Sequence, residues 1–86
     1  MGKTKNQKVI EIKIRFAMGV ARWVRERQHY CFQSEENDGM MVYHVEDVSQ
    51  IRAWILSWGD AAEVLSPKEL RKSMRETALK LANMLT

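Results

Sequence analysis

The fold is decided by residues 8–27, KVIEIKIRFAMGVARWVRER, where one periodic pattern gives way to another. Over residues 8–16 apolar and charged side chains alternate, and the apolar positions include Ile10, Ile12, Ile14 and Phe16. A period of two with β-branched side chains predicts a strand that buries one face. Over residues 17–27 apolar side chains recur at helical spacing, which predicts a short helix. A strand followed directly by a helix indicates a domain of mixed α and β structure.

A hairpin and a second helix are predicted after this unit. Residues 28–35 and 40–46 alternate again, and the turn between them contains Asp38-Gly39, a strong hairpin signal. Asp47 is a good N-cap for a helix over residues 48–58, and the spacing to Gln50 is that of a capping box. In this helix Trp54 and Trp58 share a stripe with Ile51 and Ile55, so we interpret both tryptophans as core side chains.

The last part of the chain adds an edge strand and a third helix. An apolar run over residues 61–65 predicts the strand, and Ser66-Pro67 is typical of a helix start. The helix carries one apolar stripe, made of Leu70, Met74, Ala78, Leu81 and Leu85. The order β-α-β-β-α-β with one more helix predicts an α+β, ferredoxin-like sandwich. Two helices would cover one sheet face, and the third helix or a partner would cover the other.

Length and composition fit one small domain. The chain has 86 residues, of which 45% are hydrophobic and 29% charged, and Cys31 is its only cysteine. One cysteine allows no internal disulfide, which suits a cytoplasmic location, and no apolar run reaches the roughly 20 residues of a membrane helix. We expect residues 1–7 to be a disordered tail or a remnant of cloning, and residues 8–86 to be the domain.

Charge is distributed unevenly along the chain. Residues 1–30 hold eight Lys or Arg and two acidic residues, residues 31–66 hold one Arg and seven acidic residues, and residues 67–86 hold five basic and two acidic residues. This asymmetry permits an anionic ligand near the first segment. It equally permits an acidic middle that faces basic ends, within one fold or across a dimer.

The sequence favours no catalytic or metal chemistry. His29, Cys31 and His44 fall on the predicted hairpin, but their spacing matches no zinc signature, and we expect them on a solvated sheet face. Cys31 beside His29 lacks a third group to orient the base. The four glycines are isolated, so no phosphate loop is present. We therefore expect a protein that is not an enzyme and needs no cofactor or metal.

One cluster is a candidate binding site. Arg22, Arg25 and Arg27 lie close together in the first helix with Trp23, and His29 follows. Guanidinium groups suit phosphate, and aromatic rings stack on bases. An ordinary exposed helix face explains the same residues about as well. Leu56 and Met84 fall off their helical stripes and are candidates for contacts with another domain.

Two stretches of the chain resemble a known family. Residues 55–71, ILSWGDAAEVLSPKELR, are similar to the W-I-L-x-x-G-x-x-x-E-V-L-x-P-x-x-L-R ending of WYL-domain regulators. Residues 20–29, VARWVRERQH, are similar to the V-A-R-x-V-x-E-R helix of that family. Gln33 stands where the family has the Gln of H-x-S-Q, although Tyr30, Cys31 and Phe32 replace the usual residues. The resemblance covers residues 8–85 and identifies the C-terminal extension called WCX.

The resemblance implies a ferredoxin-like domain that follows a winged-helix DNA-binding domain and a WYL domain. Neither precedes Lys8, so we expect an excised or separate piece of a bacterial transcription regulator. In the family the extension contributes to the groove for a nucleic-acid or nucleotide effector and to dimer contacts. The positions carried over as ligand contacts are Arg22, Arg25, Arg27 and His29.

Two other functions remain open from the sequence. The first is a purely structural dimerisation module, in which the arginines pair with the acidic middle of a second subunit. The second is a free-standing nucleic-acid binder that uses its open sheet face, as RNA-recognition folds do. The outward strand positions, among them Glu11, Lys13 and Arg15, lack stacking aromatics and count against this second function.

Overall fold

The computed structural model describes residues 9–85, so the tail expected over residues 1–7 lies outside the described part. The elements are β1 (Ile10–Phe16), α1 (Met18–Glu26), β2 (Phe32–Asn37), β3 (Met40–Val45), α2 (Ser49–Leu56), the 3₁₀ turn η1 (Gly59–Ala61), β4 (Ala62–Ser66) and α3 (Lys68–Leu85). Both predicted crossover helices and all four predicted strands are present. The predicted ferredoxin-like order with an additional C-terminal helix is therefore confirmed.

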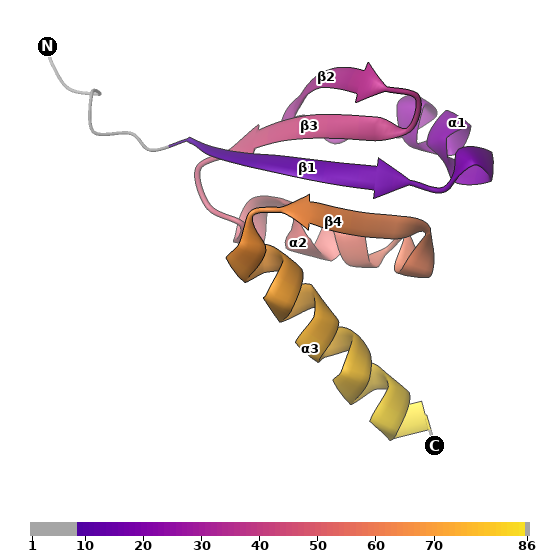
Figure 1. Ribbon diagram of the computed structural model, residues 1–86, viewed down its shortest axis with the longest axis vertical. Coiled ribbons are helices and arrows are strands. Elements are labelled where there is room, and N and C mark those ends of the chain that lie inside the picture. Colours follow the sequence, from indigo (N-terminus) through magenta and orange to yellow (C-terminus); the bar gives the residue numbers. More distant parts are fainter. Residues whose placement is uncertain (1–8, 86) are drawn as a thin grey trace, which may run out of the picture.

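The four strands form one antiparallel sheet in the order β2-β3-β1-β4. The register pairs Ile12 with Tyr43 and places Ile14 between Met41 on β3 and Val64 on β4. Directly opposed residues on neighbouring strands project to the same face, so these apolar side chains form one continuous surface. Helices α1 and α2 pack on that surface, behind the sheet in Figure 1.

The core lies between this sheet face and the two helices. Its buried members are Ile12, Ile14, Phe16, Ala21, Val24, Cys31, Met41, Tyr43, Val45, Ile51, Ile55, Val64 and Leu70. Trp54 and Trp58 are half-buried, and their rings meet the ring of Phe16 edge-on at centroid distances of 6.0 and 6.2 Å. The interpretation of both tryptophans as core side chains is confirmed. The buried face of the sheet is thus fully committed to packing.

The opposite face of the sheet is mainly polar, although Val42 and Met40 also lie on it, opposite Lys13 and Arg15. Glu11 lies 3.6 Å from His44, and Lys13 lies 3.5 Å from Glu36. The third helix does not lie across this face, contrary to one of our two expectations. It leaves the end of β4 and runs away from the sheet (Figure 1), and its side chains contact Arg52 of α2. The reason is that β4 is an edge strand, so a helix leaving it can pack against the neighbouring helix instead.

Arg52 is the main link between α2 and α3. Its guanidinium donates to the Ser73 hydroxyl at 2.8 Å and also to the Thr77 hydroxyl. Beyond Leu70, which is buried, the helix carries its apolar stripe without equivalent burial. The domain therefore ends in a long helix that is attached along its first half.

Candidate ligand-binding face

Helix α1 separates buried from exposed side chains cleanly. Ala21 and Val24 face the core, while Arg22, Trp23 and Arg25 face solvent. Trp23 is 49% exposed, an uncommon position for so large an aromatic side chain. The Arg27 guanidinium carbon lies 5.7 Å from the centre of the Trp23 ring, a cation–π distance. Arg22, Trp23 and Arg27 therefore form one exposed surface, which we call the α1 face.

Arg25 has a different role from its neighbours, because it holds the hairpin against α1. Its Nε donates to Glu35 Oε1 at 3.0 Å and its Nη2 to Glu35 Oε2 at 2.8 Å, a bidentate pair. The same Nη2 donates to Asp38 Oδ1 at 2.9 Å, and the Gly39 N–H donates to Glu35 Oε2 at 2.9 Å. The acidic middle of the chain thus pairs with a basic residue of the first segment within one fold.

These contacts change the ionisation of both partners. Hydrogen bonds from Arg25, with a further one from the Gly39 N–H, lower the pKa of Glu35 to about 2. The hydrogen bond to Glu35 raises the pKa of Arg25 above its already high value. An arginine held by two carboxylates carries little net charge toward an incoming anion. The α1 face therefore depends on Arg22 and Arg27 for its positive potential.

His29 is buried, with 9% of its surface exposed, and the expected place on a solvated sheet face is wrong. Its Nδ1 accepts the Cys31 N–H at 3.0 Å, so Nε2 carries the proton and donates to the Gln50 carbonyl at 3.0 Å. Residues 28–31 form a loop instead of the start of the strand, which turns His29 and Cys31 inward. The ring of Tyr30 stacks outside His29, with centroids 4.5 Å apart.

The four candidate ligand residues are therefore not equivalent. Arg22 and Arg27 are exposed, Arg25 is exposed but paired with two carboxylates, and His29 has both ring nitrogens occupied. His44 lies on the polar sheet face, away from the buried His29 and Cys31, and residues 9–85 contain no His, Cys, Asp or Glu cluster suited to a metal. Tyr30 is an exposed aromatic residue in the loop after α1, although the sequence pattern predicted it in a strand. Its place in the sequence directly after His29 was the one signal that could have added it to the candidate binding residues.

The low pKa of Glu35 predicts a specific acid sensitivity. Because this pKa is lower in the folded chain than in the unfolded chain, the carboxylate stabilises the fold above its ordinary pKa of 4.5. This stabilisation is lost as the pH falls from about 4.5 toward about 2. Urea unfolding at pH 7, 4.5 and 3, followed by tryptophan fluorescence, should show a steeper acid loss for the natural chain than for Glu35→Gln.

Glu36→Gln is the matched control for this measurement. Glu36 is the next residue, and its single contact with Lys13 at 3.5 Å is exposed. We expect its variant to retain the acid loss of the natural chain, since exposed ion pairs contribute little. Equal pH profiles for the natural chain and Glu35→Gln would contradict the role assigned to the Arg25–Glu35 pair.

Comparison with known proteins assigns the family. The profile of the WCX domain matches residues 8–82, which include all four strands, α1, α2 and most of α3. The searches of curated proteins and of solved structures each found no match. No helix within residues 9–85 has the length and hydrophobicity needed to cross a membrane. The profile match spans most of the chain, and the chain therefore belongs to the WCX domain family, the C-terminal extension of the WYL-domain regulators that its sequence resembles.

Proposed function

We propose that this WCX domain is the C-terminal regulatory domain of a WYL-type bacterial transcription regulator, and that it contributes to effector sensing and to dimer assembly. The proposed effector is a nucleic acid or nucleotide, and the proposed partners are WYL and winged-helix domains and a second copy of the chain. The observation that carries the proposal is the α1 face, where two arginines without a carboxylate partner among residues 9–85 flank an exposed tryptophan.

The chemistry of the α1 face fits a phosphate-bearing ligand with an aromatic base. Arg22 and Arg27 supply guanidinium donors for phosphate oxygens, and Trp23 offers a ring for stacking. Binding to one arrangement of the regulator in preference to another would shift the population of its DNA-binding form. Arg25 supports the face by holding the hairpin in place, and His29 supports it by fixing the loop after α1.

We propose further that the protein binds its ligand without catalysing a reaction, and that it acts in the cytoplasm. Its support is that Cys31 is buried and that both nitrogens of His29 already have hydrogen-bond partners. A nucleophile needs access to substrate, and a general base needs a free nitrogen within reach of the proton it removes. A cofactor has no part in the proposed function.

The experiment measures binding of a fluorescein-labelled single-stranded oligonucleotide to the chain by anisotropy over a range of salt concentrations. Each phosphate contact on a single strand contributes about −0.7 to the slope of log affinity against log salt. Replacing Arg22 and Arg27 by alanine should therefore weaken binding and make the slope shallower by about 1.4 if each contacts one phosphate. We expect weak binding by this domain alone, because a WYL domain would supply the other wall of the groove.

Arg15→Ala is the matched control for this experiment. Arg15 is an exposed arginine on the polar sheet face, away from α1. Its replacement removes the same net charge as either α1 substitution, so it reports the general effect of charge. Equal losses for Arg15→Ala and for each α1 variant would indicate nonspecific attraction and would contradict an effector site on α1.

The alternative is a purely structural dimerisation module with no ligand. The observation that favours it is the apolar side of α3, where Leu81 and Leu85 are exposed. The sequence suggested a dimer in which the arginines of α1 pair with the acidic middle segment of a second subunit. Arg25 already pairs with Glu35 and Asp38 of its own chain, so that form of the alternative loses support. A dimer contact through α3 is compatible with either function.

A further inference from the structure

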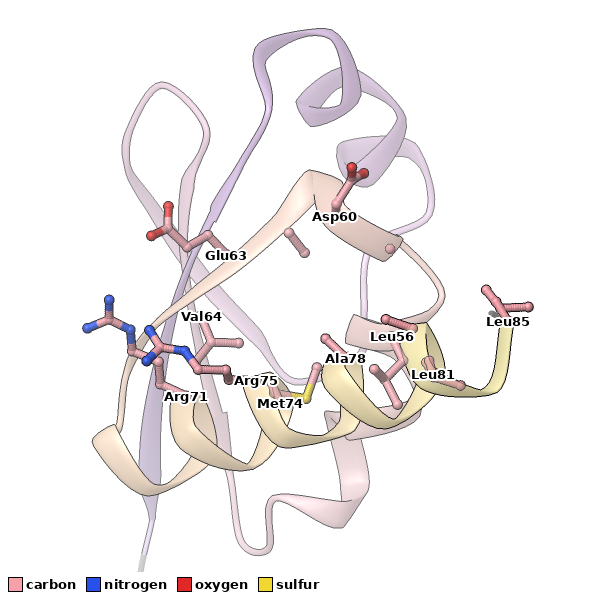
Figure 2. A pocket seen from close by; sticks show the side chains of 13 residues that line it. Leu56, Asp60, Glu63, Val64, Arg71, Met74, Arg75, Ala78, Leu81 and Leu85 are labelled. Carbon is pink, nitrogen blue, oxygen red and sulfur yellow. The ribbon is translucent and has the colours of Figure 1, made fainter.

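Four basic side chains occupy one face of the first two turns of α3. Lys68, Arg71, Lys72 and Arg75 follow the spacing i, i+3, i+4 and i+7, and together they line one open hollow on the surface of the helix. All four are exposed. Figure 2 shows the side chains of Arg71 and Arg75 extending in the same direction, away from Ala78 of the same helix. We call these four residues the α3 stripe.

The members of the α3 stripe are not engaged in the fold as Arg25 and Arg52 are. Arg25 is held by two carboxylates, and Arg52 donates to two hydroxyls of α3. In the part of the chain that the structure describes, no ion pair involves a residue of the stripe. Glu63 of β4 lines the neighbouring groove together with the two arginines of the stripe, but it lies beyond ion-pair distance of both. Water solvates exposed cations, so their freedom alone does not identify a ligand.

The place of the stripe in the helix is unfavourable for the fold. Lys68 and Arg71 lie in the first turn of α3, where the helix dipole is positive and disfavours cations. Each member of the stripe has a like charge three or four residues away, and such pairs destabilise a helix. The carboxylates of Glu69 and Glu76, on the same helix, do not line the hollow. The sequence thus breaks two local rules at one place, as is expected where function and not stability selects the residues.

Phosphate groups repeated along a backbone match the stripe. The planar fork of a guanidinium group suits phosphate oxygens, and a lysine ammonium binds them as a point charge. The stripe extends about 10 Å along the helix axis, at 1.5 Å per residue. Double-stranded DNA carries one charge per about 1.7 Å of its axis, so several phosphates fall within reach of the stripe. A single small anion would instead be held in a closed pocket, whereas the stripe is exposed along its whole length.

We propose that the α3 stripe binds the phosphate backbone of double-stranded DNA, independently of base sequence. Helix α3 contains no aromatic residue, so the stripe has no ring on which the unpaired bases of a single strand could stack. Contacts with phosphate position a protein on a duplex without reading its sequence. The inference goes beyond the effector site on α1, because it adds a DNA contact outside the proposed winged-helix domain.

The α3 stripe and the α1 face lie at opposite ends of the sheet. Helix α1 follows the end of β1, whereas α3 follows the end of β4, which runs antiparallel to β1 (Figure 1). A duplex bound to the first turns of α3 therefore leaves the α1 face open. Effector and duplex can bind at the same time, so a variant of one site is a fair control for the other.

The first test measures binding of a short fluorescein-labelled DNA duplex by anisotropy over a range of salt concentrations. Each phosphate contact on a duplex contributes about −0.9 to the slope of log affinity against log salt. Arg71→Gln/Arg75→Gln should therefore bind about tenfold more weakly, with a slope shallower by about 1.8 if each arginine contacts one phosphate. Two duplexes of unrelated sequence should give the same result.

Arg15→Gln/Lys80→Gln is the matched control, because it removes the same net charge. Arg15 lies on the sheet and Lys80 on α3 outside the stripe, and both are exposed. We expect its salt slope to equal that of the natural chain. Equal losses for the two double variants, or duplex binding that Arg71→Gln/Arg75→Gln retains in full, would overturn the inference.

The second test is thermal unfolding of the same variants, followed by circular dichroism. Because the stripe is unfavourable for the helix, Arg71→Gln/Arg75→Gln should unfold at the same temperature as the natural chain or at a higher one. A clearly lower unfolding temperature would overturn the inference, since the arginines would then serve the fold.

Competition separates a duplex from other polyanions. Unlabelled duplex should displace the labelled duplex more strongly than polyglutamate or phosphatidylglycerol vesicles of equal charge concentration. Stronger displacement by either competitor would assign the stripe to an acidic protein or to a membrane, and would contradict a DNA contact. Effector binding on α1 is tested with a single strand and the Arg22 and Arg27 variants, so its failure is distinguishable from failure of this inference.

Discussion

Replacing His29 by alanine is expected to destabilise the domain by roughly 3–5 kcal/mol. The imidazole joins the loop after α1 to α2 through hydrogen bonds with the Cys31 N–H and the Gln50 carbonyl. Alanine leaves the buried Cys31 N–H without its acceptor, which costs about 1–3 kcal/mol, and removes the contact that joins the loop to the Gln50 carbonyl of α2. It also removes a ring that packs on Trp54 at a centroid distance of 5.3 Å.

Urea unfolding followed by tryptophan fluorescence measures this effect, with His44→Ala as the control. His44 is the other histidine, and its side chain is partly exposed beside Glu11, so its loss should change stability by less than about 1 kcal/mol. If His29→Ala does not fold, His29→Asn provides a second comparison, because its amide oxygen can still accept a backbone N–H. A His29→Ala chain as stable as the natural chain would contradict the structural role assigned to His29.

The fold was predictable because period and turn chemistry agree along the whole chain. Ile10 to Phe16 alternate in the sequence and lie in β1, and Asp38-Gly39 forms the turn between β2 and β3. Asp47 lies one residue before the N-cap of α2, which is Val48, so the predicted cap is displaced by one residue. The predicted pair still meets there, since Gln50 Oε1 accepts the Asp47 N–H at 3.1 Å and Asp47 Oδ1 accepts the Ser49 N–H at 2.9 Å. Local signals of this kind are read within a few residues, so they need no knowledge of tertiary contacts.

The candidate site was predictable in composition but not in the roles of its members. The sequence places three arginines together, yet only the hairpin contact separates Arg25 from Arg22 and Arg27. The opposite charges of the first and middle segments permitted such a contact, without naming the pair. His29 was misplaced because alternation was extended across residues 28–31, where side-chain hydrogen bonds from Gln28 and His29 organise a loop. The contact that turns this loop inward, from His29 Nε2 to the Gln50 carbonyl, is a tertiary hydrogen bond and leaves no periodic trace in the sequence.

Replacing Gly39 by alanine is expected to destabilise the domain by about 2–4 kcal/mol, through backbone strain and a steric clash. Gly39 has a φ of +88°, a left-handed conformation that side chains disfavour. A Cβ there would lie 3.0 Å from the Phe16 carbonyl oxygen, while the Gly39 carbonyl accepts the Phe16 N–H at 2.8 Å. The clash therefore falls on backbone that cannot move without breaking the contact between the turn and the end of β1.

Gly59→Ala separates the two contributions, because the same substitution there adds strain without a clash. Gly59 has a φ of +63°, and nothing lies within 4 Å of the position of its Cβ. We expect a loss of about 1–2 kcal/mol, the ordinary cost of a left-handed residue with a side chain. Thermal and urea unfolding of both variants should place Gly39→Ala clearly below Gly59→Ala. Equal losses would mean that the turn relaxes away from Phe16, and would contradict a rigid contact at this end of the sheet.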